Sequence, residues 1–257
     1  MRNILRHKGI VYTSAMVIGN RRLSSVYSFL ELELLQDFPL HKPPQFIMAW
    51  VPGYEAVPMT IARRRGDRLW ILVKIAGDTT RRLAGIEEGS FIGLYGPLGK
   101  PLIPLRNKFL FLVGGSGVAT ALNYLSSLGC SRDRCLTVFG CWRYGEVGSV
   151  PELIEEFGSA TITACLDRRC DVYGTVVDAL DNIDPGGYDV IVACGPPGML
   201  KSLIDRIPLD KSIFVLDSYV KCGLGLCGSC LVPGTRYYLC IDGPGFYAWE
   251  LVEAGWH

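Results

Sequence analysis

The chain has 257 residues, of which 49% are hydrophobic and 20% are charged, and its 26 Lys and Arg residues against 25 Asp and Glu residues give a formal net charge of +1. No apolar run reaches the ~18 residues of a membrane span, and no basic stripe with interleaved aromatic residues is present. These features exclude a membrane-spanning protein and make nucleic acid a poor partner. Residues 1–8 are basic but no apolar signal core follows them, so we expect a cytoplasmic protein.

The first hundred residues carry short β-branched stretches separated by turn residues. These stretches span 10–18, 26–34, 45–51, 59–63, 69–75 and 91–95. Short strands broken by Gly and Pro at regular spacing are typical of an antiparallel barrel or sandwich, and we predict a barrel over residues 1–104. Glycines and prolines are crowded at 96–104, which indicates the linker that ends this unit.

Residues 105–216 follow a different pattern. Continuous apolar runs lie at 109–113, 135–141, 160–166, 189–194 and 212–216, and helical candidates lie at 118–128, 151–157, 175–180 and 198–206. Strands that are apolar on both faces and alternate with helices predict a parallel, doubly wound sheet.

Two loops that follow apolar runs in this region have the composition of nucleotide-binding turns. One is Gly114-Gly115-Ser116-Gly117, and the other is Cys194-Gly195-Pro196-Pro197-Gly198-Met199. Glycines let a backbone approach phosphates closely, and helix amides favour negative charge. The spacing differs from Gly-x-Gly-x-x-Gly, so a plain strand-to-helix turn remains an alternative, and a lone Cys194 is more often a small buried hydrophobe. Both loops are expected on one side of the sheet, where they can hold one dinucleotide.

Four of the ten cysteines form the pattern Cys222-x4-Cys227-x2-Cys230-x9-Cys240. The first three spacings match the plant-type two-iron arrangement, and the intervening glycines allow the backbone to pass close to a cluster. A structural zinc site is the alternative, but such sites usually contain two Cys-x2-Cys pairs and this segment contains one. We predict that residues 217–257 form a small module whose four cysteines hold a 2Fe-2S cluster.

The order of these features resembles the electron-transfer subunit of dihydroorotate dehydrogenase, in the ferredoxin reductase superfamily. A barrel is followed by the GGSG turn, by CGPPGM, and by a four-cysteine segment that continues into CIDGPGF, so the resemblance covers nearly the whole chain. It implies an oxidoreductase subunit of pyrimidine biosynthesis, with FAD on the barrel, NAD(H) on the second domain and a 2Fe-2S cluster at the C-terminus.

The resemblance also implies which residues hold the flavin. The family's flavin segment, commonly Arg-Pro-x-Ser, corresponds to Val57, Pro58, Met59 and Thr60. Thr60 is expected to hydrogen-bond the isoalloxazine, and Val57 replaces the arginine. The adjacent flavin-contacting strand is Leu72, Val73 and Lys74, and the phosphate contact falls on Thr79 and Thr80, with Arg81 or Arg82 to supply charge.

The dinucleotide is expected on Gly114, Gly115 and Gly117, while Gly195 and Pro196 would shape the nicotinamide pocket. Cys194 would lie near the point of transfer, so Cys194 and Thr60 are the predicted catalytic residues. A nicotinamide delivers two electrons as hydride and an iron–sulfur cluster accepts one, and a flavin between them can do both. The resemblance implies that electrons then pass to or from an FMN-containing catalytic subunit of dihydroorotate dehydrogenase, in a heterotetramer.

Two other functions stay open. One is the small subunit of a ferredoxin-dependent NADP reductase or sulfide dehydrogenase, whose family resembles this chain but carries Asp where Cys222 stands. The other is a nucleotide-binding module with a structural zinc. The sequence also leaves open the choice between NADH and NADPH at Arg143, the affinity for FAD given Val57, the direction of electron flow, and the state of the remaining cysteines: Cys130, Cys135, Cys141, Cys165 and Cys170.

Overall fold

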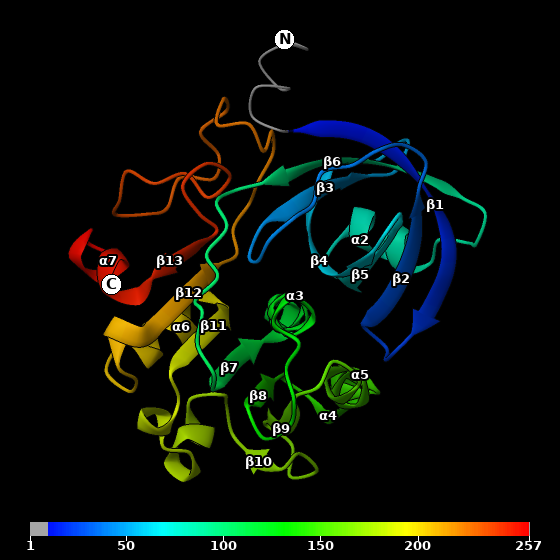
Figure 1. Ribbon diagram of the computed structural model, residues 1–257. Helices are drawn as coiled ribbons and strands as arrows, with labels where there is room; N and C mark the ends of the chain where they lie inside the picture. Colours follow the sequence, from blue (N-terminus) through cyan, green and yellow to red (C-terminus); the bar gives the residue numbers. More distant parts are fainter. Residues whose placement is uncertain (1–9, 257) are drawn as a thin grey trace.

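The computed structural model describes residues 10–256 as a closed barrel beside a seven-stranded sheet (Figure 1). The barrel strands are β1 (Val11–Arg22), β2 (Tyr27–Leu34), β3 (Phe46–Trp50), β4 (Val57–Arg65), β5 (Arg68–Lys74) and β6 (Phe91–Leu98). They close in the order β1-β2-β5-β4-β3-β6, and neighbouring strands are antiparallel. Every strand overlaps a stretch predicted from the sequence, so the barrel is confirmed.

One barrel element was not predicted. Helix α2 (Asp78–Ala84) stands between β5 and β6 and packs Leu83 and Ala84 into the barrel core beside Leu30 and Ile71. The helix is short and carries only two buried residues, so its apolar pattern is too brief to be recognised in the sequence.

The sheet has the strand order β10-β9-β8-β7-β11-β12-β13. Its strands are β7 (Phe109–Gly114), β8 (Cys135–Gly140), β9 (Ala160–Cys165), β10 (Val172–Tyr173), β11 (Val190–Gly195), β12 (Ser212–Leu216) and β13 (Gly245–Tyr247). All neighbouring pairs are parallel except β12 and β13, which are antiparallel. The parallel sheet is therefore as predicted.

Helices cover both faces of this sheet. Helices α3 (Val118–Leu128), α4 (Tyr144–Val147) and α5 (Val150–Glu156) lie on the barrel side, and α6 (Pro197–Leu203) and α7 (Ala248–Glu253) pack on the other (Figure 1). Alternate residues of β7 serve the two faces, since Phe111 joins the core beneath α3 and Leu112 joins the core beneath α6. Among residues 10–256, no helix is long and apolar enough to cross a membrane.

One prediction for this half of the chain is corrected. The helix expected at 175–180 is only a short 3₁₀ segment, η2 (Asp178–Asn182), because the Asp178 carboxylate accepts hydrogen bonds from both the amide and the hydroxyl of Thr175, at 2.6 and 2.8 Å. The C-terminal segment also rejoins the large sheet through β13. Trp256 is buried there against Phe214, so this tryptophan belongs to the core.

A tight contact fixes the turn after β7. The 3₁₀ segment η1 (Gly115–Gly117) leads from β7 into α3 and lies directly against β11. A Cβ on Gly117 would stand 2.1 Å from the carbonyl oxygen of Cys194. Only glycine therefore allows the two loops to approach each other this closely.

Two disulfides close short loops on the barrel-facing side of the sheet. Cys130 pairs with Cys135, and Cys165 pairs with Cys170, each with a sequence separation of 5. Disulfides in cytoplasmic proteins occur mainly in hyperthermophiles.

We predict that Gly117→Ala lowers the free energy of unfolding by at least about 2 kcal/mol, because the methyl group meets backbone that cannot move aside. The matched control is Gly198→Ala on α6, where a Cβ would have no atom within 4 Å. That variant should be neutral or slightly stabilising. Chemical denaturation of both chains measures the difference, and equal stabilities would contradict the contact.

We also predict that replacing Cys165 and Cys170 together by serine lowers the free energy of unfolding by about 2 kcal/mol, the loop-closure contribution of so short a loop. Cys141→Ser, which removes a free thiol, is the control. A reducing agent also opens Cys130–Cys135, so it should destabilise the parent chain by the contribution of both disulfides and the double variant only by that of Cys130–Cys135. A double variant as stable as the parent chain would show that the Cys165–Cys170 disulfide does not stabilise the fold.

Candidate functional site

A first cavity of about 250 Å³ opens between the barrel and the sheet. Its lining comes from β3, β4 and β5, from α2, from η1 and α3, from the ends of β11 and β12, and from the C-terminal segment. The predicted site residues in this lining are Val57, Pro58, Met59, Thr60, Leu72, Lys74, Thr80, Gly117 and Cys194. Most of the residues predicted to hold a flavin are thus gathered around one hollow.

Val73 is placed differently. Leu72 and Lys74 line the cavity, while Val73 is fully buried in the barrel core. Successive side chains of a strand point to opposite faces, so a run of three consecutive residues cannot turn all its side chains to one ligand. Val73 can therefore face the cavity only through its backbone, and its place in the flavin-contacting strand stays a prediction.

The two threonines of α2 have local roles. The Thr80 hydroxyl accepts hydrogen bonds from the amides of Ala76 and Gly77, at 2.8 and 2.9 Å, and Thr79 donates to the carbonyl of Glu55 at 3.2 Å. Arg81 forms an ion pair with Asp78. Thr80 still lines the first cavity, whereas Thr79 lies outside that lining.

A second cavity of about 410 Å³ lies at the carboxyl ends of β7, β8 and β11. Predicted residues Gly114, Gly115 and Pro196 line it, while Gly195 lies behind Met199, whose side chain covers it. Met199, the last residue of the CGPPGM loop, also lines it, as do Trp142 and Leu166. The sequence analysis did not assign Trp142 or Leu166 to a site, although Trp142 directly follows the apolar run at 135–141 and Leu166 ends the run at 160–166.

Lys74 lines both cavities. A Cβ on Gly115 would lie 2.8 Å from its Nζ atom, so the ammonium group stands directly beside the glycine turn. The same Nζ is 5.8 Å from the centre of the Tyr27 ring. One positive charge therefore stands in the wall between the two hollows.

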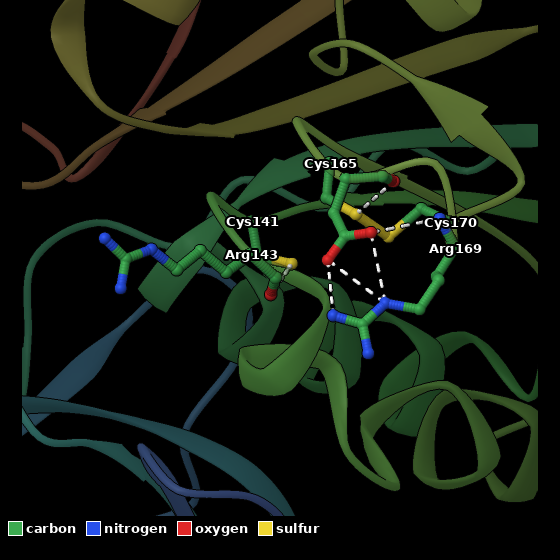
Figure 2. Close-up of polar contacts among 6 residues, drawn as sticks. Cys141, Arg143, Cys165, Arg169 and Cys170 are labelled. Atoms are coloured by element: carbon green, nitrogen blue, oxygen red, sulfur yellow. Dashed lines mark hydrogen bonds and ion pairs between the residues drawn. A yellow bond between two sulfur atoms is a disulfide. The ribbon is translucent and has the colours of Figure 1, made fainter.

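Figure 2 shows Cys141, which lines the second cavity, together with polar contacts close to it in the chain and in the neighbouring loop after β9. The Cys141 thiol donates to the carbonyl of Arg143 at 3.3 Å, and Arg169 pairs with Asp167, with Nε 3.1 Å from Oδ1. The Arg143 side chain points away from that ion pair (Figure 2). Burial raises the pKa of Cys141 to about 11, so this thiol is neutral near pH 7.

Cys194 and Thr120 form a buried polar pair on the wall of the first cavity. The Thr120 hydroxyl donates to Sγ of Cys194 at 3.3 Å. Burial raises the pKa of the Cys194 thiol to about 12, although the hydrogen bond from Thr120 opposes the shift. The thiol is therefore protonated and uncharged near neutral pH.

Asp217 is a cavity residue that sequence reasoning missed. It follows β12 directly, and its carboxylate accepts a hydrogen bond from the Ser116 hydroxyl at 3.1 Å. Burial raises the pKa of this carboxyl, against the hydrogen bonds from Ser116 and the Ser218 amide and the charge of Lys74. The first polar residue after an apolar strand of a parallel sheet was the signal that could have found it.

The four cysteines of the C-terminal segment come together in two pairs. The Sγ atoms of Cys230 and Cys240 are 3.3 Å apart, and the side chains of Cys222 and Cys227 are within hydrogen-bonding reach. Within the part of the chain that the structure describes, no three ligand side chains gather around one metal position. Two pairs of thiols fit a cluster that shares four ligands between two irons better than they fit a single zinc ion.

The local chemistry also fits a metal cluster. Hydrogen bonding with Ser229 and then with Cys222 lowers the pKa of Cys227 to about 6, whereas burial, with the neighbouring Cys230, raises the pKa of Cys240 to about 12. A buried thiol of that kind becomes a thiolate only beside a cation such as iron. Positive φ angles at Gly223, Gly225 and Gly228 (64°, 75° and 75°) let the backbone curl around the sulfur atoms.

The cysteine segment shares a wall with the first cavity. Val220 and Leu239 both line that cavity, and Leu239 immediately precedes Cys240. The Tyr95 hydroxyl on β6 also donates to the carbonyl of Cys222, at 3.4 Å. The cavity at the barrel, the second cavity and the cysteine pairs therefore form one continuous arrangement.

Comparison with known proteins identifies this arrangement. Residues 217–252 match the family model for the iron-sulfur cluster binding domain of dihydroorotate dehydrogenase B. A protein of Archaeoglobus fulgidus named "Probable dihydroorotate dehydrogenase B (NAD(+)), electron transfer subunit" is 34% identical over 215 residues, covering 81% of this chain and 87% of the relative. A relative of the same name from Pyrococcus furiosus is 30% identical over 211 residues, covering 82% and 81%.

Solved structures show the same fold. A structure of an NADH-dependent reduced ferredoxin-NADP oxidoreductase has a TM-score of 0.74 at 25% identity, covering 93% of this chain and 92% of the other. A flavohemoglobin from Malassezia yamatoensis has a TM-score of 0.66 at 14% identity over 84% of this chain and 63% of that one, which shows the fold alone. The predicted oxidoreductase class and its cofactors, a 2Fe-2S cluster, FAD and NAD(H), agree with this fold and family. The chain belongs to the family of dihydroorotate dehydrogenase B electron transfer subunits.

Proposed function

We propose that this chain passes electrons between NAD(H), FAD and a 2Fe-2S cluster and exchanges them with an FMN-containing catalytic subunit of dihydroorotate dehydrogenase, in pyrimidine biosynthesis. The observation that supports the proposal is that the two cavities and the cysteine segment lie against one another through common or adjacent residues. Lys74 belongs to both cavities, and Leu239 connects the first cavity to the cysteine pairs. Three redox groups held in this order form a chain from a two-electron donor to a one-electron acceptor.

The first cavity is the proposed isoalloxazine site. Pro58, Thr60 and Leu72 present apolar surface and one hydroxyl to a flat ring, and Lys74 supplies positive charge at its edge. Val57 lines the cavity where the resembling family has an arginine, so in this chain the positive charge comes from Lys74. Cys194 offers a neutral, buried thiol that adds no charge and keeps water from that part of the wall.

The second cavity is the proposed site of NAD(H). Gly114 and Gly115 leave room for phosphates at the glycine turn, and Trp142 offers an apolar face for an aromatic base. Pro196 and Lys74 stand on the side toward the first cavity. When bound, the nicotinamide donates or accepts a hydride and the flavin exchanges the electrons singly with the cluster.

Cys222, Cys227, Cys230 and Cys240 are the proposed cluster ligands. Cys227 is exposed, and Leu226 beside it has 72% of its surface accessible. We propose that the catalytic subunit docks on this face, because electrons cross between proteins only where the redox centre lies near the surface. A heterotetramer of two such pairs, located in the cytoplasm, remains a prediction.

A second candidate function is supported by one observation. The likeness to the NADH-dependent reduced ferredoxin-NADP oxidoreductase covers 93% of this chain, so a small subunit of a ferredoxin–NADP reductase-type complex has the same architecture. Purification from the native cell separates the two. A copurifying FMN subunit that oxidises dihydroorotate supports the first function, and a different flavoprotein partner supports the second.

We predict that the parent chain binds about two iron atoms and that Cys227→Ala binds fewer, because one of the four cluster ligands is lost. The visible absorbance of the cluster should fall with it, while bound FAD and its bleaching by NADH persist. Cys141→Ala, at the only free thiol besides Cys194 outside the cysteine segment among the described residues, is the control and should retain the iron. Anaerobic spectra with iron, sulfide and flavin analysis measure these quantities. A colourless parent chain that binds zinc would overturn the proposal.

We predict that Trp142→Ala raises the Kd for NADH about 10-fold, the loss expected when an aromatic stacking surface is removed. FAD content should not change, because Trp142 lines only the second cavity. Trp249→Ala is the matched control. Trp249 is also an exposed tryptophan, with 41% of its surface accessible against 65% for Trp142, but it lines neither cavity. Binding is measured by fluorescence titration of the FAD-loaded chain, and equal Kd values for both variants would place the nucleotide elsewhere.

A further inference from the structure

The first cavity contains one carboxyl group among its described lining residues, that of Asp217. The residue stands at the carboxyl end of β12 and begins the segment that leads to Cys222. Ser116, on the glycine turn, holds its carboxylate by a hydrogen bond of 3.1 Å. Nothing in the electron path described above uses this group.

The surroundings of Asp217 favour proton exchange. Protein atoms surround most of the Asp217 carboxyl group, and its accessible surface faces the first cavity. A ligand bound in that cavity would therefore remove this carboxyl group from solvent. The other titratable groups of the lining are Lys74, whose charge favours the carboxylate, and Cys194, whose buried thiol remains protonated. Among the described residues, Asp217 forms no ion pair within 4.0 Å that would hold it permanently ionised.

The proposed function requires a proton to leave this cavity. A hydride carries one proton and two electrons to the flavin, whereas an iron–sulfur cluster accepts electrons only. For each hydride received, two electrons therefore leave one at a time toward the cysteine pairs. One proton, released from the flavin ring nitrogen that gained the hydride, must leave by another route.

We propose that Asp217 accepts this proton and releases it to solvent, and that Ser116 is the positioning residue that holds the carboxylate. The inference rests on the proposed function. The N–H bond of the reduced ring would break and an O–H bond would form on Asp217. The two electrons would go to the cluster one after the other, the second after the cluster has passed the first to the catalytic subunit. In the reverse direction of flow, Asp217 returns the proton to the ring.

The test follows the FAD- and cluster-loaded chain after anaerobic mixing with NADH, where flavin bleaching reports hydride transfer and a later change reports reduction of the cluster. In the parent chain, the rate of the later phase should rise with pH as Asp217 loses its proton and then level off. Asp217→Asn should slow this phase about 100-fold relative to the first and abolish its pH dependence. Asp217→Glu should restore the pH dependence, and Asp210→Asn, at an exposed carboxyl outside the cavity lining, is the matched control.

The positioning role has its own readout. The hydrogen bond from Ser116 favours the charged carboxylate, so Ser116→Ala should raise the pKa of Asp217 and move the pH profile to higher pH. A merely structural role for Ser116 would lower cofactor content or stability without moving the profile.

Infrared titration of the FAD-loaded parent chain provides a second measurement, which stands even if Asp217→Asn fails to bind FAD. A carboxyl band should titrate with the midpoint of the kinetic profile and shift in frequency in Asp217→Glu. The absence of such a band, or a later phase in Asp217→Asn as fast and as pH-dependent as in the parent chain, would overturn the proton role. If NADH fails to reduce flavin and cluster in the parent chain, the proposed function itself fails, so the two failures are distinguishable.

Discussion

The contact between η1 and β11 is the constraint on which the rest of the site depends. Gly117 lies so close to the Cys194 carbonyl that no side chain fits between them. This approach brings the turn after β7 against the end of β11, and it leaves one hollow on the barrel side and another beyond the glycines. Because Lys74 reaches the same turn from β5, its side chain lines both cavities.

A second constraint comes from the way the cysteine segment is attached. It leaves the sheet after β12 and returns in β13, which is the next strand of the same sheet, so both of its ends are fixed. The Lys100 amide donates to the Gly243 carbonyl at 2.6 Å, and Tyr95 holds the Cys222 carbonyl. A loop tied to barrel and sheet in this way keeps its sulfur atoms at a constant separation from the first cavity, as electron transfer requires.

The sequence predicted those features that depend on residues close together in the chain. Short β-branched stretches between turn residues predicted the barrel strands, the apolar runs predicted the parallel strands, and the Cys-x4-Cys-x2-Cys spacing indicated the cluster type. It could not predict groups whose role depends on distant partners. Ser116 and Asp217 are 101 positions apart, and Lys74 belongs to the barrel but reaches the glycine turn of the other half. Asp217 carries no motif beyond its position as the first polar residue after an apolar strand, and only the fold shows that it lines a cavity.

Under the proposed function, one short stretch of chain beside the first cavity would serve both the route of the electrons and the route of the proton. Electrons need near contact between redox groups, and Val220 and Leu239 provide an apolar wall toward the cysteines with no competing charge. A proton needs instead an oxygen that is open to solvent, and the surface of Asp217 is open while β12 before it is buried. Residues 217–222 thus run from a polar group at the cavity to a thiol at the cluster. In the proposed mechanism the proton of the hydride would go to Asp217 at the start of this segment, and its electrons would go to the cluster at Cys222.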